Sequence, residues 1–176
     1  MGSGLLSVKD YLEKFLEIGE ESFVKQYNHP FLLHPEQVSS EVLATFHTRM
    51  ADRRGGARIS DHFKGIHDYQ VLVPTVKPGK SLPKKLMVGR TPDRDIFVDH
   101  ATVSKRHAYI LFDLSTWSYK LGDAGSTNGT SLNGMTVRTE SMELRDGNVV
   151  SFGKSDFFFF TPLGFADLLK RLQAEK

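Results

Sequence analysis

The chain has 176 residues, of which 39% are hydrophobic and 25% charged, and its formal net charge is +2, so it suits an ordinary soluble domain with extensions. Cysteine is absent, which excludes a disulfide framework and a thiolate metal site and favours a reducing, cytoplasmic location. No apolar run approaches the ~20 residues of a membrane helix. Leu5-Leu6 has no basic flank, so we expect no signal peptide.

An amphipathic helix is expected from about residue 7 to 26. Ser7 and Asp10 have the spacing of a capping box, and the helix should end before Asn28-His29-Pro30. Apolar residues recur at helical spacing, namely Val8, Leu12, Phe15, Leu16 and Phe23. The other faces are acidic, with five carboxylates against two lysines between residues 7 and 21. We expect the apolar stripe to dock on the neighbouring domain.

Residues 28–68 are less informative. Phe31-Leu32-Leu33 is typical of a short strand, 41–50 fits a helix or a strand, and 52–56 is a turn or loop. Five histidines fall here without i,i+4 spacing or a compact ligand pattern, at positions 29, 34, 47, 62 and 67. We therefore expect scattered surface histidines and no metal site. Residues 1–68 are predicted to be an N-terminal extension, the helix followed by an irregular segment.

Residues 69–161 change to a β pattern. Short β-like runs separated by turns occur at 69–73, 86–88, 96–98, 107–114, 118–121, 130–132, 135–137, 142–144, 148–152 and 156–160. Asn133-Gly134 and Asp146-Gly147 are strong hairpin-turn signals. Many short strands without intervening helical patterns predict an all-β fold, an antiparallel β-sandwich.

The end of the chain predicts a strand covered on both faces, followed by a helix. Residues 157–160 are four consecutive phenylalanines, so one face should meet the sandwich core and the other a helix. Thr161 is suited to the N-cap of that helix and Pro162 to its first turn. Its apolar stripe consists of Phe165, Leu168, Leu169 and Leu172. A short C-terminal helix at 162–176 is therefore expected to pack on the domain.

Three motifs stand where strands meet turns. They are Gly89-Arg90, then Ser104-Lys105-Arg106-His107, and then the run from Gly125 to Thr130, which Asn133-Gly134 follows. An arginine fork makes paired charge-assisted hydrogen bonds to a phosphate, which lysine cannot reproduce. Each motif alone is a weak signal, but donors converging from loops on a rigid β scaffold would form an anion site.

In residue type, order and spacing these motifs resemble the forkhead-associated (FHA) domain, a module that binds phosphothreonine, over residues 69–161. The resemblance implies that Arg90, Ser104 and Lys105 bind the phosphate. It implies that Thr127 also touches the phosphate and that Asn128 binds the peptide backbone. Supporting positions are Gly89, His107, Gly129, Asn133 and Gly134. Thr102 matches a loop position that contributes to peptide specificity, although the preferred sequence does not follow from it.

The resemblance implies a non-catalytic binding protein without a cofactor, whose partner is a phosphothreonine segment made by an upstream Ser/Thr kinase. An enzyme would have to pair Ser104 with His107, yet a nucleophile elbow and a Walker-type loop are both absent from the sequence. Two alternatives remain. One is nucleic-acid binding through residues 77–106, where eight Lys/Arg face three Asp without an aromatic platform beyond Phe97. The other is an FHA-fold scaffold that binds its partner without phosphate.

A regulatory hypothesis concerns the acidic helix at 7–26. Its charge complements the basic face around Arg90, so the helix would lie across the binding loops, in the same chain or in a self-associated neighbour. The alternative is that the helix packs elsewhere through its apolar stripe.

Overall fold

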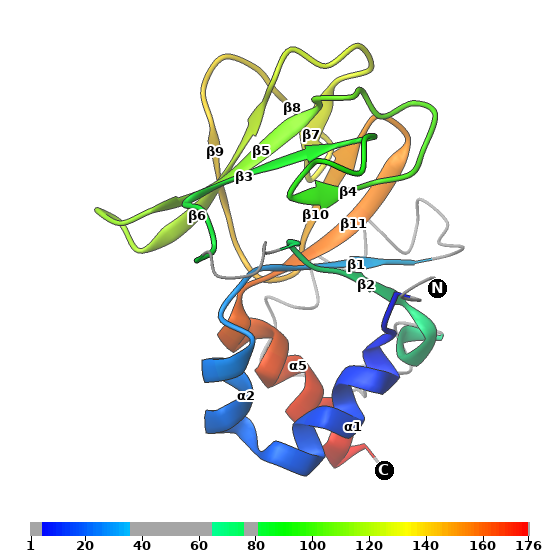
Figure 1. Ribbon diagram of the computed structural model, residues 1–176, viewed down its shortest axis with the longest axis vertical. Coiled ribbons are helices and arrows are strands. Elements are labelled where there is room, and N and C mark those ends of the chain that lie inside the picture. The colour runs from blue at the N-terminus through cyan, green and yellow to red at the C-terminus, as the bar shows by residue number, and fades with distance from the viewer. Residues whose placement is uncertain (1–4, 36–64, 76–80, 176) are drawn as a thin grey trace.

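The computed structural model describes residues 5–35, 65–75 and 81–175, which form two stacked β-sheets with a layer of helices against one of them (Figure 1). The expected fold class, an antiparallel β-sandwich with helical extensions, is confirmed. The expectations for 41–50 and 52–56, together with His47 and His62, lie outside the described residues. In the described part, no helix is both long and apolar enough to cross a membrane.

The first sheet, sheet A, has the strand order β2-β1-β11-β10-β7-β8. Its strands are β1 (Phe31–His34), β2 (Gln70–Leu72), β7 (Thr130–Leu132), β8 (Met135–Val137), β10 (Asn148–Phe152) and β11 (Ser155–Phe160). The second, sheet B, has the order β4-β3-β5-β6-β9. Its strands are β3 (Lys85–Gly89), β4 (Ile96–Phe97), β5 (Ala108–Asp113), β6 (Ser118–Asp123) and β9 (Met142–Leu144). Among the described pairs only β3 and β4 run parallel.

The four phenylalanines of β11 divide between two apolar cores. Phe157 and Phe159 point into the core between the sheets, and Phe158 and Phe160 point into the core beneath the helices. Successive side chains of a strand alternate between its faces, so a strand with apolar residues at every position must be covered on both sides. The expectation drawn from this run is confirmed.

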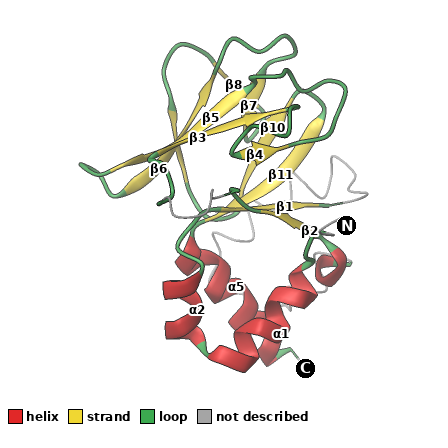
Figure 2. Ribbon diagram, in the orientation of Figure 1, coloured by secondary structure: helices red, strands yellow, loops and turns green. Residues whose placement is uncertain are grey.

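The helical layer consists of α1 (Val8–Ile18), α2 (Glu20–Gln26) and α5 (Pro162–Ala174), and Figure 2 shows it on the outer side of β1 and β11. The expected helix at 7–26 begins with its capping box but breaks at Gly19. Gly19 has φ 79° and ψ 163°, a conformation that is essentially restricted to glycine. The break lets α2 turn back, so that Phe23 enters the same core as α1.

Strand β1 comes from the expected N-terminal extension, yet it lies between β2 and β11 in sheet A. A short 3₁₀ turn, η1 (Ile66–Asp68), leads into β2. At the other end, the Thr161 hydroxyl caps α5 by accepting from the Gly164 amide. The boundaries at 68/69 and 161/162 stay predictions, but β1 and the helices are integral to the packing.

Candidate functional site

The end of β3 lies against the segment that contains Ser104 and Lys105. The Arg90 amide donates to the Ser104 carbonyl at 3.0 Å, and the Thr91 hydroxyl donates to the Lys105 carbonyl at 3.3 Å. A Cβ on Gly89 would lie 2.2 Å from the same Lys105 oxygen. Glycine is therefore required for this approach, which makes exposed Arg90 and partly exposed Ser104 neighbours.

His107 ties this segment to the loop between β6 and β7. Its ring is fully buried; Nδ1 accepts from the Ser104 amide at 2.9 Å, and Nε2 lies 2.9 Å from the Gly129 carbonyl. Because a carbonyl only accepts, Nε2 carries the proton and the imidazole is neutral. Burial lowers the pKa of His107 below its ordinary value. This is the arrangement that the expected supporting role requires.

The two segments bring the expected contact residues together. The Thr127 amide donates to Ser104 Oγ at 3.1 Å, with the two side-chain hydroxyls 3.4 Å apart. Asn128 Nδ2 donates to the Thr102 carbonyl at 2.8 Å. Lys105, Thr127 and Asn128 are exposed. Within the described residues the guanidinium of Arg90 has no hydrogen bond or ion pair, so it is free for a ligand.

Asp123 organises the loop, and sequence reasoning missed it. Its carboxylate accepts from the amides of Gly125 and Ser126 at 2.9 and 3.0 Å, and from the hydroxyls of Ser126 and Thr130 at 2.6 Å each. Burial alone would raise the pKa of Asp123, but these hydrogen bonds outweigh burial and lower it. The sequence signal was an aspartate two residues before a glycine and three before a serine, an Asx-turn pattern.

Thr102 joins a third loop to the site. Its carbonyl accepts from Asn128, and its hydroxyl oxygen accepts from the Lys154 amide at 2.9 Å in the turn after β10. His100 Nδ1 lies 2.8 Å from the same hydroxyl. The threonine side chain therefore braces the loops, and its expected part in peptide specificity stays a proposal.

Asn133 and Gly134 are the expected residues that the structure does not bring to the site. They form a left-handed turn between β7 and β8, with φ values of 53° and 78°. The Asn133 side chain accepts from the Val149 amide at 2.9 Å. This turn stands at the opposite end of β7 from Gly129, so it supports sheet A rather than the loops around Arg90.

The acidic helix lies away from these loops. Val8, Leu12, Phe15 and Phe23 are buried in the core shared with α5 and β11, whereas Leu16 of the expected stripe is exposed. Figure 1 shows the helical layer on the far side of sheet A from β3 and β4. The docking expected for the stripe is observed at the four buried residues, but not at Leu16. Among the described residues no hydrogen bond or ion pair links α1 or α2 to Arg90, Ser104 or Thr127, so the structure gives no support to covering of the site by the helix of the same chain.

The described residues contain no group of three or more His, Asp or Glu side chains placed to hold a metal ion. The site offers another chemistry: one arginine, one lysine, two hydroxyls and an amide on three converging loops. Such donors suit a compact anion of high charge. The geometry is that of a recognition domain, a β-sandwich whose strand-connecting loops gather donor groups suited to an anion.

Comparison with known proteins gives the family. Residues 86–153 match the family model of the FHA domain, and this chain contains an FHA domain. Over 73 residues it is 44% identical to the glycogen accumulation regulator GarA of Mycolicibacterium smegmatis, covering 42% of this chain and 44% of the relative. Over 71 residues it is 38% identical to the oxoglutarate dehydrogenase inhibitor of Corynebacterium efficiens, covering 40% and 47%. The matched segment thus spans less than half of either relative.

Among solved structures, the N-terminal FHA domain of S. cerevisiae Rad53p, in complex with a phosphothreonine peptide, is 23% identical to this chain. The superposition covers 56% of this chain and 89% of that one, with a TM-score of 0.44.

Gly89→Ala is expected to destabilise the protein and to disrupt the site. The added Cβ meets a backbone oxygen that cannot rotate away, so β3 and the Ser104 segment must separate, at about 1–3 kcal/mol or more. Urea denaturation measures the loss. Gly65→Ala is the control, because Gly65 has φ +78° but open space around it. At temperatures well below unfolding, only Gly89→Ala should weaken ligand binding. Equal effects of both variants on binding would contradict a collision between the added Cβ and the Lys105 oxygen.

Acid is expected to destabilise the fold through His107. The folded-state pKa is lowered, so the unfolded chain, with a histidine pKa of about 6.5, binds more protons between the two values. The stability that the neutral ring contributes is complete above the unfolded pKa of about 6.5 and is lost as the pH falls through the lowered folded-state pKa. Thermal unfolding across this range should show the loss.

The control uses His29→Gln, because burial also lowers the pKa of His29. The pH dependence of the unfolding temperature that remains in His29→Gln should follow the protonation of His107, which imidazole ¹⁵N NMR measures. A His107 ring that is already protonated at neutral pH would contradict the assigned tautomer.

Proposed function

We propose that the protein binds phosphothreonine-containing segments of partner proteins through Arg90, Ser104, Lys105, Thr127 and Asn128. The observation that supports this proposal most is the buried His107, which holds two loops together so that donors far apart in sequence converge. Recognition of a phosphorylated motif by basic side chains is an established peptide-binding mode of FHA domains. The residue assignments are part of the proposal.

Each side chain offers the group its proposed role needs. The exposed guanidinium of Arg90 would grip two phosphate oxygens, and Lys105 would add a point charge. The hydroxyls of Ser104 and Thr127, which lie together, would donate to the phosphate. Asn128 uses its amide nitrogen on Thr102, which leaves its side-chain oxygen to accept a peptide N–H.

The proposed role is non-catalytic and needs no cofactor. Ser104 contacts His107 through its backbone amide, and both ring nitrogens of His107 are engaged, so the ring is not positioned as a base for the serine hydroxyl. Two of the similar proteins are named as a regulator and as an inhibitor, which also supports a regulatory role. We further propose a cytoplasmic setting in which a Ser/Thr kinase creates the ligand.

Fluorescence anisotropy against a degenerate phosphothreonine peptide library tests the proposal. Unphosphorylated and phosphoserine libraries are the controls, and free phosphothreonine peptide is the competitor. We expect saturable binding that requires the phosphate. Binding that ignores the phosphate would indicate a scaffold. Binding to an oligonucleotide with a steep salt dependence would instead indicate a nucleic-acid protein.

A further inference from the structure

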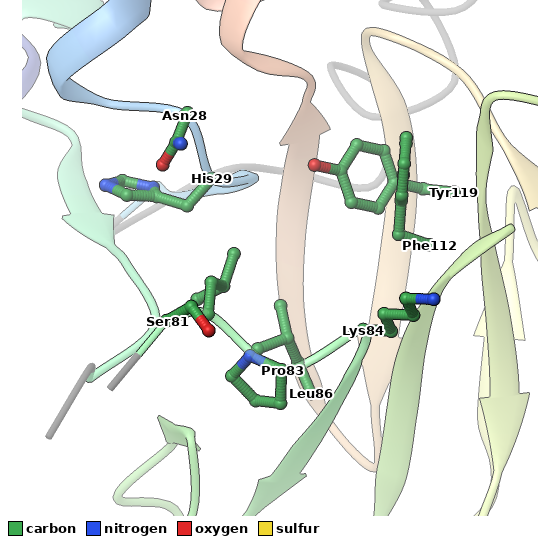
Figure 3. A pocket seen from close by; sticks show the side chains of 9 residues that line it. Asn28, His29, Ser81, Pro83, Lys84, Leu86, Phe112 and Tyr119 are labelled. Atoms are coloured by element: carbon green, nitrogen blue, oxygen red, sulfur yellow. The ribbon is translucent and has the colours of Figure 1, made fainter. Parts of the chain in front are cut away.

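A second surface lies away from the proposed phosphopeptide site. An apolar groove, here called the hairpin groove, runs between the β5–β6 hairpin and the helical layer, where Phe112 and Tyr119 approach Val24 of α2 and Leu163 of α5. Its central cavity is about 540 Å³ and adjoins one of about 460 Å³ beside α2. A further 470 Å³ cavity continues it, with Asn28 and His29 on one side and Phe112 and Tyr119 on the other (Figure 3). Three adjoining cavities form an extended groove, which suits contact with a protein surface better than binding of a small molecule.

Trp117 stands on the rim of this groove in an unfavourable setting. Its side chain is 78% exposed, and Leu163 across the groove is 69% exposed. The Trp117 backbone has φ 51°, in the left-handed region that glycine and asparagine adopt more readily than tryptophan. Within the described chain, the aromatic contact of this large, mostly exposed side chain is with Phe112, at a backbone position that disfavours tryptophan. Such an outlier points to a contact outside the chain.

The hairpin presents this side chain rigidly. Asp113 accepts from the amide and hydroxyl of Ser115 and forms a 2.6 Å ion pair with Lys120 across the two strands. These donors hold the pKa of Asp113 well below its usual range. The Trp117 ring also meets Phe112 edge to face at 5.9 Å. A pre-ordered aromatic side chain loses little entropy on docking, which favours its use as an interface anchor.

The charge around the hairpin groove indicates what can approach it. The charged lining residues are Glu20, Glu21, Asp146, Lys25, Lys84 and Arg145, three acidic and three basic. Lys25 already pairs with Glu21, Glu20 with Lys170, and Arg145 with Glu143. A two-fold interface brings one patch against itself, so a charged patch would repel its copy whereas a neutral patch does not.

We propose that a second copy of this chain occupies the hairpin groove, in a two-fold dimer where Trp117 of each copy enters the groove of the other. The exposed anchor and the apolar groove adjoin one another, as reciprocal insertion across a symmetry axis requires. The hairpin and the Ser104–His107 segment stand at opposite ends of β5, so the dimer leaves both phosphopeptide sites open. Two sites in one particle would bind doubly phosphorylated or clustered partners more tightly than one site does.

The test exploits the fact that Trp117 is the sole tryptophan. Sedimentation velocity and tryptophan emission are followed together over a dilution series of the full chain. We expect a concentration-dependent dimer whose emission shifts to shorter wavelength as it forms. Trp117→Asn suits the left-handed backbone, so it should remain folded and become monomeric. Leu163→Glu, at the acid-tolerant start of α5, should be monomeric too. Leu16→Ser, at a 47% exposed residue of α1 outside the groove, is the matched control and should still dimerise.

Mixing the variants tests the reciprocal geometry. Trp117→Asn keeps Leu163 and the other residues that line the groove, and Leu163→Glu keeps the Trp117 anchor. An equimolar mixture should therefore regain weak association through one of the two contacts. A wild-type chain that remains monomeric with solvent-exposed tryptophan emission at every concentration overturns the proposal and leaves the groove to a different protein. A dimer that survives both variants overturns it as well. Peptide binding is measured separately, so neither result bears on the proposed phosphothreonine site.

Discussion

Arg90→Ala should weaken binding of a phosphothreonine peptide by about 10- to 100-fold or more. A hydrogen bond to a charged group contributes about 1.5–3 kcal/mol, and each 1.4 kcal/mol is tenfold in affinity. Arg90 is exposed and its guanidinium is unpaired among the described residues, so its loss leaves no buried charge and should not change stability. The fall in affinity would therefore report ligand contacts alone.

Arg90→Lys separates charge from geometry. Lysine retains the charge but not the planar fork, so its affinity should lie between wild type and Arg90→Ala. Arg171→Ala is the control, because Arg171 lies on α5 in an ion pair with Asp167 and far from the loops. Calorimetric titration with one phosphopeptide compares all three variants. If Arg90→Ala binds as tightly as Arg171→Ala does, Arg90 is not a phosphate ligand.

Phe23→Ala should destabilise the whole protein by about 3–5 kcal/mol, the usual result of truncating a buried phenylalanine. Phe23 is completely buried, and the rings of Tyr11, Phe15, Phe31 and Phe165 surround it. These neighbours come from α1, β1 and α5, so one cavity loosens three elements at once. Chemical denaturation followed by circular dichroism measures the effect.

Leu16→Ala provides the matched control for this prediction. Leu16 lies on α1 but is exposed, so its truncation should cost less than about 1 kcal/mol. Phosphopeptide affinity of Phe23→Ala should equal that of wild type where the variant is still folded. A small loss of stability in Phe23→Ala would show that the helical layer is not part of the cooperative fold.

By the same reasoning, deletion of residues 1–27 should expose Phe158, Phe160 and Phe165 and prevent folding.

The sandwich could be predicted from sequence because its signals are local. Ten expected runs correspond to β2–β11 within one or two residues, since turns such as Asn133-Gly134 fix where the strands end. The phenylalanines of β11 even indicated the two cores, because alternation assigns each ring to a face. The break at Gly19 was missed, because an isolated glycine inside a helical pattern is often tolerated and only tertiary packing of Phe23 requires the turn.

The site was less predictable than the fold. The motifs identified which side chains to consider, but convergence depends on long-range hydrogen bonds such as those from His107 to Ser104 and Gly129. The role of Asp123 could have been read from its spacing to Gly125 and Ser126. The position of Asn133 could not have been predicted from its spacing, because it depends on which end of β7 faces the loops around Arg90.

The most direct test of the proposed function is where the ligand binds. A ¹⁵N-labelled chain is titrated with a phosphothreonine peptide and with its unphosphorylated form, and amide shifts are mapped onto the structure. We predict phosphate-dependent shifts confined to residues 89–91, 102–107 and 124–130, with the helices α1, α2 and α5 unaffected. Shifts centred on the helical layer, or identical shifts with and without the phosphate, would contradict a phosphothreonine site at Arg90 and Ser104.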